Sequence, residues 1–155
     1  MPTKVAKNAK FDPVFAENRK ARHDYTVLDT IECGIQLRGT EVKSVRHGEV
    51  SLSGAYGAVL KGELWLVGAD IAAYRFGNRF NHEPKSMRKL LVHANEVEEL
   101  RLKTEAKGLT LIPLKVYLKG GRIKVALGVC RGKALHDKRE SLKDKAVRRD
   151  MERGA

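Results

Sequence analysis

Two short segments of the chain carry side chains suited to binding a polyanion. Residues 76–89 combine four basic side chains, three amide or imidazole groups and two aromatic rings, and their Gly, Asn and Pro content predicts a loop. Basic groups fix phosphates, while the other groups can stack on unpaired RNA bases or read their edges. Residues 132–139 likewise concentrate Lys, Arg and His. The alternative for both segments is ordinary solvated surface.

The sequence contains no convincing catalytic motif. Residues 128–133 faintly match a phosphate-binding loop, but the spacing is one residue short and Ala134 replaces the Ser or Thr that would hold magnesium. The five histidines show no metal-ligand spacing. His23–Asp24 and His136–Asp137 are adjacent pairs, and neighbours in a strand point to opposite faces. We therefore expect a protein that is not an enzyme and needs no cofactor or metal.

The charge balance favours a nucleic-acid partner. The 155 residues include 31 Lys and Arg against 19 Asp and Glu, a formal net charge of +12. Such a surplus attracts polyanions by releasing their counterions, with an anionic membrane as the second choice. Residues 1–23 and 131–155 each carry +4, whereas the same surplus is spread over the 107 residues between them. The ends therefore resemble arms on a central globule.

Hydropathy and cysteine use indicate a cytoplasmic protein. No stretch approaches the ~18–20 apolar residues of a membrane-spanning helix. The basic residues 1–10 are not followed by the apolar region of a secretory signal. Cys33 and Cys130 each stand alone among apolar neighbours, which argues against a disulfide or a zinc site and predicts two buried thiols.

The central part of the chain predicts many short strands. Runs rich in β-branched residues predict strands at 25–31 and 34–37. Two hairpins are predicted at 58–67 and 109–129, each reversing at glycines that supply a positive φ. Pro113 lacks an N–H to donate and predicts an edge position or a bulge.

Two short helices are predicted between the strands. The first is capped by Thr40, covers 41–47 and ends at Gly48, and the second begins after Asn95 and ends at Gly108. Several short strands with two small helices suggest a mainly β fold, a closed or nearly closed barrel, because closure removes exposed strand edges.

The C-terminal segment predicts a helix that does not fold alone. Nothing in 142–153 breaks a helix, but its few apolar residues form too thin a stripe to dock on a core. A free helix of about 12 residues is marginal in water. We expect this segment to become helical only against RNA.

Six segments, taken together and in order, resemble the SsrA-binding protein (SmpB) family, whose members bind transfer-messenger RNA. Each segment is weak evidence alone, but six in register between about residues 16 and 143 are highly specific. The matching segments are 18–25 (NRKARHDY), 32–35 (ECGI), 39–44 (GTEVKS), 88–91 (RKLL), 107–115 (KGLTLIPLK) and 136–139 (HDKR).

The resemblance implies a fold and a function. It implies an OB-like closed β-barrel at 16–130 with two or three flanking helices, a flexible arm at 1–15, and a basic tail at 131–155 that becomes helical on the ribosome. Such a protein would bind the tRNA-like domain of transfer-messenger RNA and deliver it to stalled ribosomes for trans-translation. The tail would probe the decoding centre and the empty mRNA channel. Expected partners are this RNA and the ribosome, with the protein a monomer in the RNA complex.

The resemblance also implies site residues. Contacts with the tRNA-like domain are expected from Glu32, Arg88, Lys89, Leu91, His93 and Lys124. Contacts in the decoding centre are expected from Gly132, Lys133, His136, Asp137, Lys138 and Arg139. The tail helix is expected to use Lys143, Lys145, Arg148 and Arg149. Ala134 and Val147 depart from the Lys and Trp of many relatives, which puts individual contacts in doubt.

Among these residues, Glu32 is the least expected in an RNA site. Its carboxylate would repel phosphate, but it can accept hydrogen bonds from base amino groups or ribose hydroxyls. Lys124 would neutralise a phosphate. The rival interpretations are another OB-fold RNA binder, such as a translation factor or ribosomal protein, and an RNA-processing enzyme.

Overall fold

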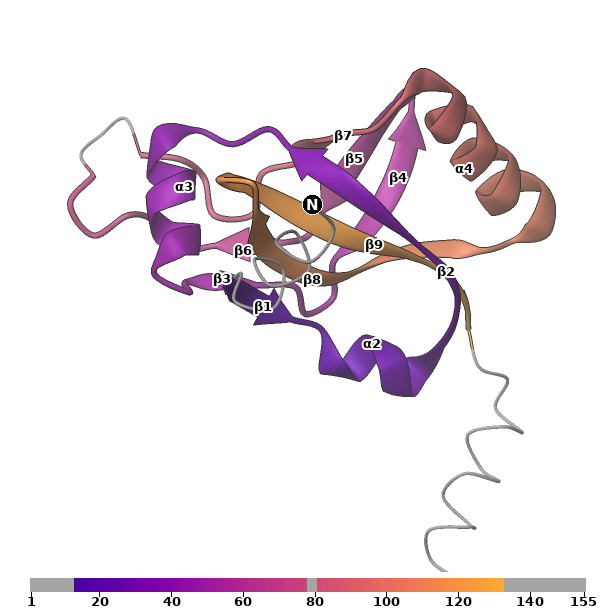
Figure 1. The fold of residues 1–155 in the computed structure, drawn as a ribbon, viewed down its shortest axis with the longest axis horizontal. Coiled ribbons are helices and arrows are strands. Elements are labelled where there is room, and N and C mark those ends of the chain that lie inside the picture. The colour runs from indigo at the N-terminus through magenta and orange to yellow at the C-terminus, as the bar shows by residue number, and fades with distance from the viewer. Residues whose placement is uncertain (1–12, 78–80, 133–155) are drawn as a thin grey trace, which may run out of the picture.

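The computed structural model describes residues 13–77 and 81–132, which form a mainly β protein with three helices (Figure 1). No helix in these two ranges is long and apolar enough to cross a membrane. The elements are β1 (Val14–Glu17), α2 (Arg19–Asp24), β2 (Tyr25–Ile35), α3 (Gly39–Arg46), β3 (Val50–Ser51), β4 (Tyr56–Leu60), β5 (Glu63–Val67), β6 (Asp70–Ile71), β7 (Arg88–Leu91), α4 (Ala94–Lys107), β8 (Thr110–Lys119) and β9 (Arg122–Gly132).

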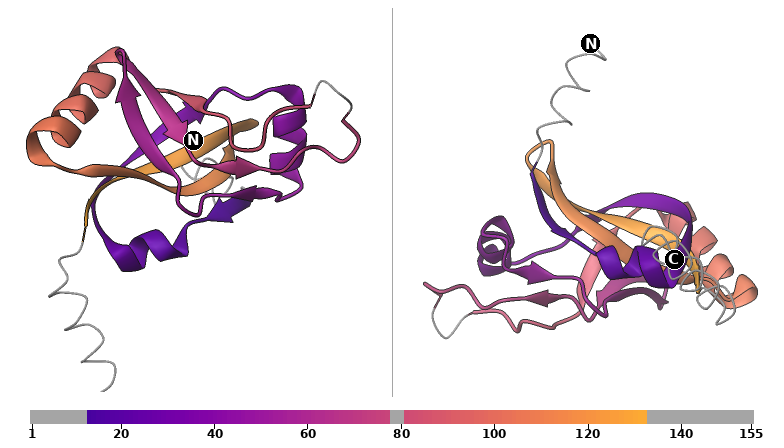
Figure 2. Two further views of the ribbon diagram at one scale, coloured as in Figure 1. Left: turned by 180° about the vertical axis from the view of Figure 1, so that it is seen from behind. Right: turned by 90° about the horizontal axis from the view of Figure 1, so that it is seen from below.

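In the described part of the chain, seven strands form one antiparallel sheet in the order β1-β8-β4-β5-β7-β2-β9. β9 also pairs with β8, so the pairings of six strands close into a ring. Alternate residues of these strands point inward, and Leu64, Leu66, Leu90, Leu111 and Leu127 are almost fully buried there. Every view of the ribbon places α3 and α4 at opposite ends of the ring (Figures 1 and 2).

Both predicted hairpins are confirmed. β4 and β5 reverse at Lys61 and Gly62, with φ values of 50° and 76°. β8 and β9 reverse at Gly120 and Gly121, with φ values of 59° and 75°. Two consecutive left-handed residues match the right-handed twist of the flanking strands.

The bulge predicted at Pro113 is also confirmed. The register between β8 and β9 shifts between Pro113 and Lys115. Asn18 is hydrogen-bonded to this bulge. Its backbone N–H donates to the Leu114 carbonyl (2.8 Å), and its carboxamide donates to the Pro113 carbonyl (3.0 Å). The bulge therefore fixes the chain just before α2.

The strand predicted at 25–31 and the first half of the one predicted at 34–37 are a single strand, β2, which ends at Ile35 rather than Leu37. The prediction of a break was wrong because Cys33 and Gly34 continue the ladder, opposite Val125 and Lys124 of β9. The interruption lies instead at Leu28, where the register with β9 shifts and the side chain is exposed.

The first predicted helix is present but begins earlier. Arg38, not Thr40, is the N-cap of α3, and its backbone N–H donates to the Glu41 carboxylate at 2.8 Å. The Thr40 hydroxyl is used elsewhere, at 2.9 Å from Nδ1 of His82. Gly48 follows the helix with a φ of 75°, as predicted.

The other two helices differ more from the prediction. The N-cap of α4 is His93 rather than Asn95, while its C-cap is the predicted Gly108, in the left-handed conformation. α2 was not predicted from its local sequence. It is only six residues long and is held by tertiary contacts and by Asn18, whose carboxamide oxygen accepts a hydrogen bond from the Ala21 N–H.

The folded body runs slightly past the predicted domain limits of 16–130, since β1 begins at Val14 and β9 ends at Gly132. Most of the predicted arm and tail lies outside the described residues. The prediction of two buried thiols is confirmed, because Cys33 and Cys130 are fully buried and unpaired. Burial raises the pKa of Cys33 to about 12 and raises that of Cys130 as well.

Candidate nucleic-acid interface

Three neighbouring strands bring Glu32, Leu91 and Lys124 onto one surface. Leu91 of β7 lies opposite Gly34 of β2, and Gly34 lies opposite Lys124 of β9. Directly opposite residues share a face of a sheet, and so do residues two apart on one strand. Glu32, two residues before Gly34, therefore shares this face. We call this surface, made by Glu32, Gly34, Leu91 and Lys124, the β2–β7–β9 face.

Gly34 shapes the middle of this face. A Cβ at this position would lie 3.2 Å from Cβ of Leu91, so a larger residue would push the leucine away. With glycine there, the Leu91 side chain lies over β2 and remains 48% exposed. An exposed leucine on a sheet surface offers apolar contact to a ligand.

A groove of about 410 Å³ begins at Leu91 and Lys124 and extends to α3. Its apolar lining includes Ile35 and Ile123. Its charged lining residues are Arg46, Arg122 and Lys124, all of them cations. A lining that combines apolar side chains with cations suits a nucleic-acid backbone, whose sugars are less polar than its phosphates.

The Glu32 carboxylate is oriented by two donors from β8. The Tyr117 hydroxyl donates to Oε2 of Glu32 at 2.7 Å, and Nζ of Lys119 donates to the same oxygen at 3.0 Å. Among the described residues Oε1 has no protein donor, so it can accept a hydrogen bond from RNA. The Tyr117 hydrogen bond, assisted by Lys119 and by the charge of Lys124, holds the pKa of Glu32 below its ordinary value of 4.5.

Tyr117 is the functional candidate that the sequence argument missed. Burial, and then its hydrogen bond to Glu32, raises the pKa of Tyr117, so the hydroxyl remains a donor. Nζ of Lys115 lies 4.9 Å from the centre of the Tyr117 ring, and the two pack on the same surface as Lys119. The alternation of residues 115, 117 and 119 in a predicted strand was the available signal.

Replacing Tyr117 with Phe tests this arrangement. We expect the free energy of unfolding to fall by about 1 kcal/mol at pH 7, because the hydrogen bond to Glu32 is lost. The loss is modest because water can replace the hydroxyl at the partly exposed carboxylate. The pKa of Glu32 should rise toward 4.5. A carboxyl with a lowered pKa stabilises the fold fully above its unfolded pKa and loses that effect as the pH falls through the folded value. Urea denaturation at several pH values should therefore show the two proteins converging below pH 4.5. A difference independent of pH would contradict the assignment.

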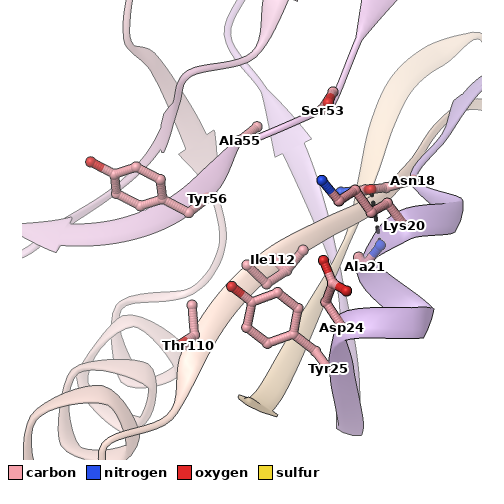
Figure 3. A pocket seen from close by; sticks show the side chains of 11 residues that line it. Asn18, Lys20, Ala21, Asp24, Tyr25, Ser53, Ala55, Tyr56, Thr110 and Ile112 are labelled. Atoms are coloured by element: carbon pink, nitrogen blue, oxygen red, sulfur yellow. Dashed lines mark hydrogen bonds between the residues drawn. The ribbon is translucent and has the colours of Figure 1, made fainter. Parts of the chain in front are cut away.

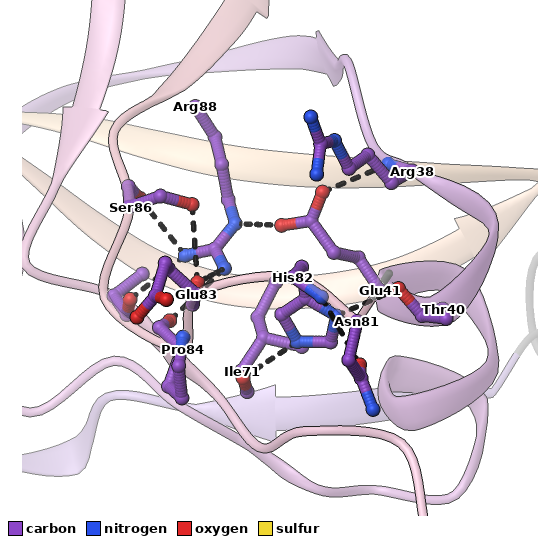
Figure 4. A network of polar contacts seen from close by, with 11 residues as sticks. Arg38, Thr40, Glu41, Ile71, Asn81, His82, Glu83, Pro84, Ser86 and Arg88 are labelled. Atoms are coloured by element: carbon purple, nitrogen blue, oxygen red, sulfur yellow. Dashed lines mark hydrogen bonds and ion pairs between the residues drawn. The ribbon is translucent and has the colours of Figure 1, made fainter. Parts of the chain in front are cut away.

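Arg88, in contrast, lies inside the protein. It is 3% exposed, and its Nε donates to the Glu41 carboxylate, which is also buried (Figure 4). Its remaining four donors are taken by backbone carbonyls, those of Ala69, Glu83, Pro84 and Ser86. With all five N–H groups satisfied, Arg88 has a structural role in place of the predicted RNA contact.

The other predicted residues near β7 are at the surface. Lys89 shares the face of Leu91, two residues away, with Nζ 3.6 Å from a Glu63 carboxylate oxygen. His93 is exposed at the start of α4. Gly132 ends β9 opposite Tyr25. The predicted residues beyond it lie outside the described residues, namely Lys133, His136, Asp137, Lys138, Arg139, Lys143, Lys145, Arg148 and Arg149.

A second concavity, of about 270 Å³, lies near the opposite end of β2. Figure 3 shows Tyr56 on one side of it and Lys20, Asp24 and Tyr25 on the other. Its lining includes one cation and one anion, so it lacks the positive bias of the groove beside Lys124. Charge therefore favours the groove as the RNA site.

His23 and Asp24 contact each other, contrary to the argument that neighbours point apart. Nδ1 of His23 lies 3.0 Å from a carboxylate oxygen of Asp24. The two residues end α2 and are not in a strand, so the alternation of strand side chains does not apply to them. Both side chains are partly exposed, so this is a contact at the protein surface.

The chain is similar to known proteins along most of its length. The family model described as SmpB protein matches residues 15–155. The SsrA-binding protein of Staphylococcus haemolyticus is 54% identical over 147 residues, 95% of this chain and 94% of that protein. That of Staphylococcus carnosus is 54% identical over 150 residues, 96% of each chain. A solved structure described as "tmRNA-SmpB: a journey to the center of the bacterial ribosome" is 48% identical, covering 84% of this chain and 94% of its own, with a TM-score of 0.67.

Proposed function

The chain belongs to the SmpB protein family, and from this we propose that it binds the tRNA-like domain of transfer-messenger RNA and delivers that RNA to stalled ribosomes for trans-translation. Relatives with more than half of their aligned residues identical are SsrA-binding proteins. The similar solved structure concerns tmRNA-SmpB and the bacterial ribosome.

The observation that carries the proposal is the β2–β7–β9 face with its cationic groove. Lys124, Arg46 and Arg122 neutralise phosphates, and Leu91 contacts a sugar or base. The unoccupied Oε1 of Glu32 accepts from an amino group or a 2′-hydroxyl, which distinguishes RNA from a plain polyanion.

The closed ring of pairings supports an OB-like barrel, a fold whose outer strand surface commonly binds nucleic acid. Binding and delivery need no bond to be made or broken by the protein. We accordingly propose a cytoplasmic monomer in its RNA complex that has no catalytic activity of its own.

The C-terminal tail supplies the recognition of stalled ribosomes. Lys133, His136, Lys138 and Arg139 enter the decoding centre, where the imidazole stacks on a base and the cations hold phosphates. The helix that follows lies in the mRNA channel. An intact message fills that channel and excludes the helix, so steric competition selects ribosomes whose message has ended.

Replacing Lys124 with Ala is expected to weaken binding to transfer-messenger RNA and to lower the slope of log K against log salt by about one phosphate contact. Titrations at about 50 and 200 mM salt measure both changes. The matched control is Lys107→Ala, an exposed lysine at the far end of α4, which should leave the slope nearly unchanged. Equal effects of the two substitutions would show that Lys124 contributes only general charge.

Competition distinguishes the proposal from its rivals. An ordinary tRNA and an unrelated RNA hairpin should both compete poorly with transfer-messenger RNA. Equal competition would indicate a general RNA binder. Turnover of labelled RNA by the pure protein with magnesium would instead indicate an RNA-processing enzyme.

A further inference from the structure

A cluster of aromatic and cationic side chains lies beside α3 and has no part in the contacts described so far. Two residues of this helix region contact the Tyr74 ring, with Nζ of Lys43 5.3 Å from its centre and the His47 ring stacked at 6.3 Å between ring centres. Phe76 meets Tyr74 edge-on, at 5.6 Å between ring centres. Phe76 is 78% exposed, more than any other large apolar side chain in the described ranges. We call Tyr74, Phe76, Lys43 and His47 the α3 cluster.

The turn that carries Phe76 is rigidly held. Nδ2 of Asn81 donates to the Tyr74 carbonyl (2.8 Å), while its Oδ1 accepts from the Tyr74 N–H (3.2 Å). Gly77 closes the turn through its N–H to the same carbonyl (2.9 Å). A Cβ on Gly77 would lie 2.3 Å from Nδ2 of Asn81, so only glycine fits. These hydrogen bonds hold the backbone on either side of Phe76, and its ring contacts Tyr74, which reduces the ordering cost of binding.

The return of the loop is anchored to the same helix. His82 is buried, its Nε2 donates to the Ile71 carbonyl at 2.9 Å, and its Nδ1 faces the Thr40 hydroxyl of α3 (Figure 4). The buried Arg88 ties the next residues of the loop to Glu41, one residue further along α3. The loop that follows the α3 cluster is therefore tied to α3 through His82 and Arg88.

The helix also links the α3 cluster to the groove on the β2–β7–β9 face. Val42 and Arg46, four residues apart, line that groove together with Lys124. Lys43 and His47, also four apart, occupy the adjacent stripe of α3. One RNA lying in the groove can therefore continue over the helix onto the rings.

The charge around the α3 cluster suits such an RNA. Lys43 and Arg46 lie on α3, and the exposed Arg75 lies between the two aromatic residues of the turn. The nearby carboxylate of Glu49 is 3.7 Å from the Arg75 guanidinium, so it offsets one of these three cations. A net positive surface next to a fixed, exposed ring combines the two features that bind single-stranded nucleotides.

We propose that the α3 cluster is a stacking platform for an unpaired nucleotide of the transfer-messenger RNA held on the β2–β7–β9 face, a proposal that rests on the function proposed above. The face of the Phe76 ring receives the base. Arg75 and Lys43 lie near its flanking phosphates. Tyr74 supports Phe76 from behind through the edge-on contact.

The test compares Phe76→Leu, which keeps an apolar side chain but removes the ring, with Phe76→Trp, which keeps a ring. In titrations of the full chain with transfer-messenger RNA, Phe76→Leu should lose about tenfold in affinity, the effect of one lost base–aromatic stack. Phe76→Trp should bind as the wild type does. The matched control is Leu102→Ala. Leu102 is also an exposed apolar residue, but it lies on α4, so its replacement should have no effect.

Chemical probing of the bound RNA adds a second readout. One unpaired base should be protected by the wild type and become reactive with Phe76→Leu, while the other protections remain. Unchanged affinity for Phe76→Leu would overturn the platform. If that variant keeps its affinity but loses ribosome rescue, the ring binds ribosomal RNA instead. If Lys124→Ala weakens binding and Phe76→Leu does not, the proposed function stands and only the platform is wrong. A wild-type protein that does not prefer this RNA would overturn both.

Discussion

Replacing Arg88 with Ala is expected to lower the free energy of unfolding by about 3–5 kcal/mol, because it leaves the buried Glu41 charge without its partner. The guanidinium also satisfies four backbone carbonyls in the 69–86 region, which would lose their donors together. Buried groups left without hydrogen bonds are among the few causes of losses this large.

The matched control is the next residue along β7. Lys89 is partly exposed and makes one loose ion pair with Glu63, so Lys89→Ala should cost about 0.5 kcal/mol or less. Urea denaturation measures both variants. If Arg88→Ala does not fold, Arg88→Lys serves in its place, since one ammonium group cannot reach all five acceptors. Equal stabilities for the Arg88 and Lys89 variants would contradict the structural role.

Truncation after Gly132 is expected to abolish peptide tagging on stalled ribosomes while leaving affinity for transfer-messenger RNA within about twofold of the full chain. Gly132 lies eight positions beyond Lys124 along β9, which at about 3.3 Å per residue is up to roughly 26 Å. The residues of the β2–β7–β9 face and of the groove all precede the cut.

Two assays on the same preparations check this separation. Titration with the RNA measures affinity, and tagging of a peptide on ribosomes stalled at the end of a truncated message measures rescue. A matched variant, His136→Ala in the full chain, should reduce tagging without changing affinity or chain length. A collapse of affinity on truncation would place the tail in the RNA site, and full rescue by the truncated chain would remove its proposed role.

The strands and turns were largely predictable because their signals are local. Gly62 and the Gly120–Gly121 pair marked the two hairpins, and Pro113 marked the bulge, since each constrains its own backbone. α2 was missed because six residues carry little local signal, and Asn18 caps them from a position fixed by contacts with β8.

The site was harder to predict because its members meet through strand pairing. Glu32, Leu91 and Lys124 came from the family resemblance, and nothing in their local sequence sets them on one face. Arg88 was misplaced for the same reason, since its partner Glu41 is 47 positions away and no local pattern shows that the two meet. The hydrogen bond between Tyr117 and Glu32 could be predicted only from the register of β8 beside β9, which the local sequence does not give.

The closed ring has a consequence for how the protein is made. β2 finds its partner in β9, whose residues follow it by 90 positions at Gly34–Lys124 and by 107 at Tyr25–Gly132. During synthesis the β2 edge that pairs with β9 therefore stays unpaired until β9 has left the ribosome. A nascent chain released before β9 is made exposes a long, unpaired strand edge that can pair with other chains. The ring of this chain therefore closes only once β9, which ends at Gly132, has been made.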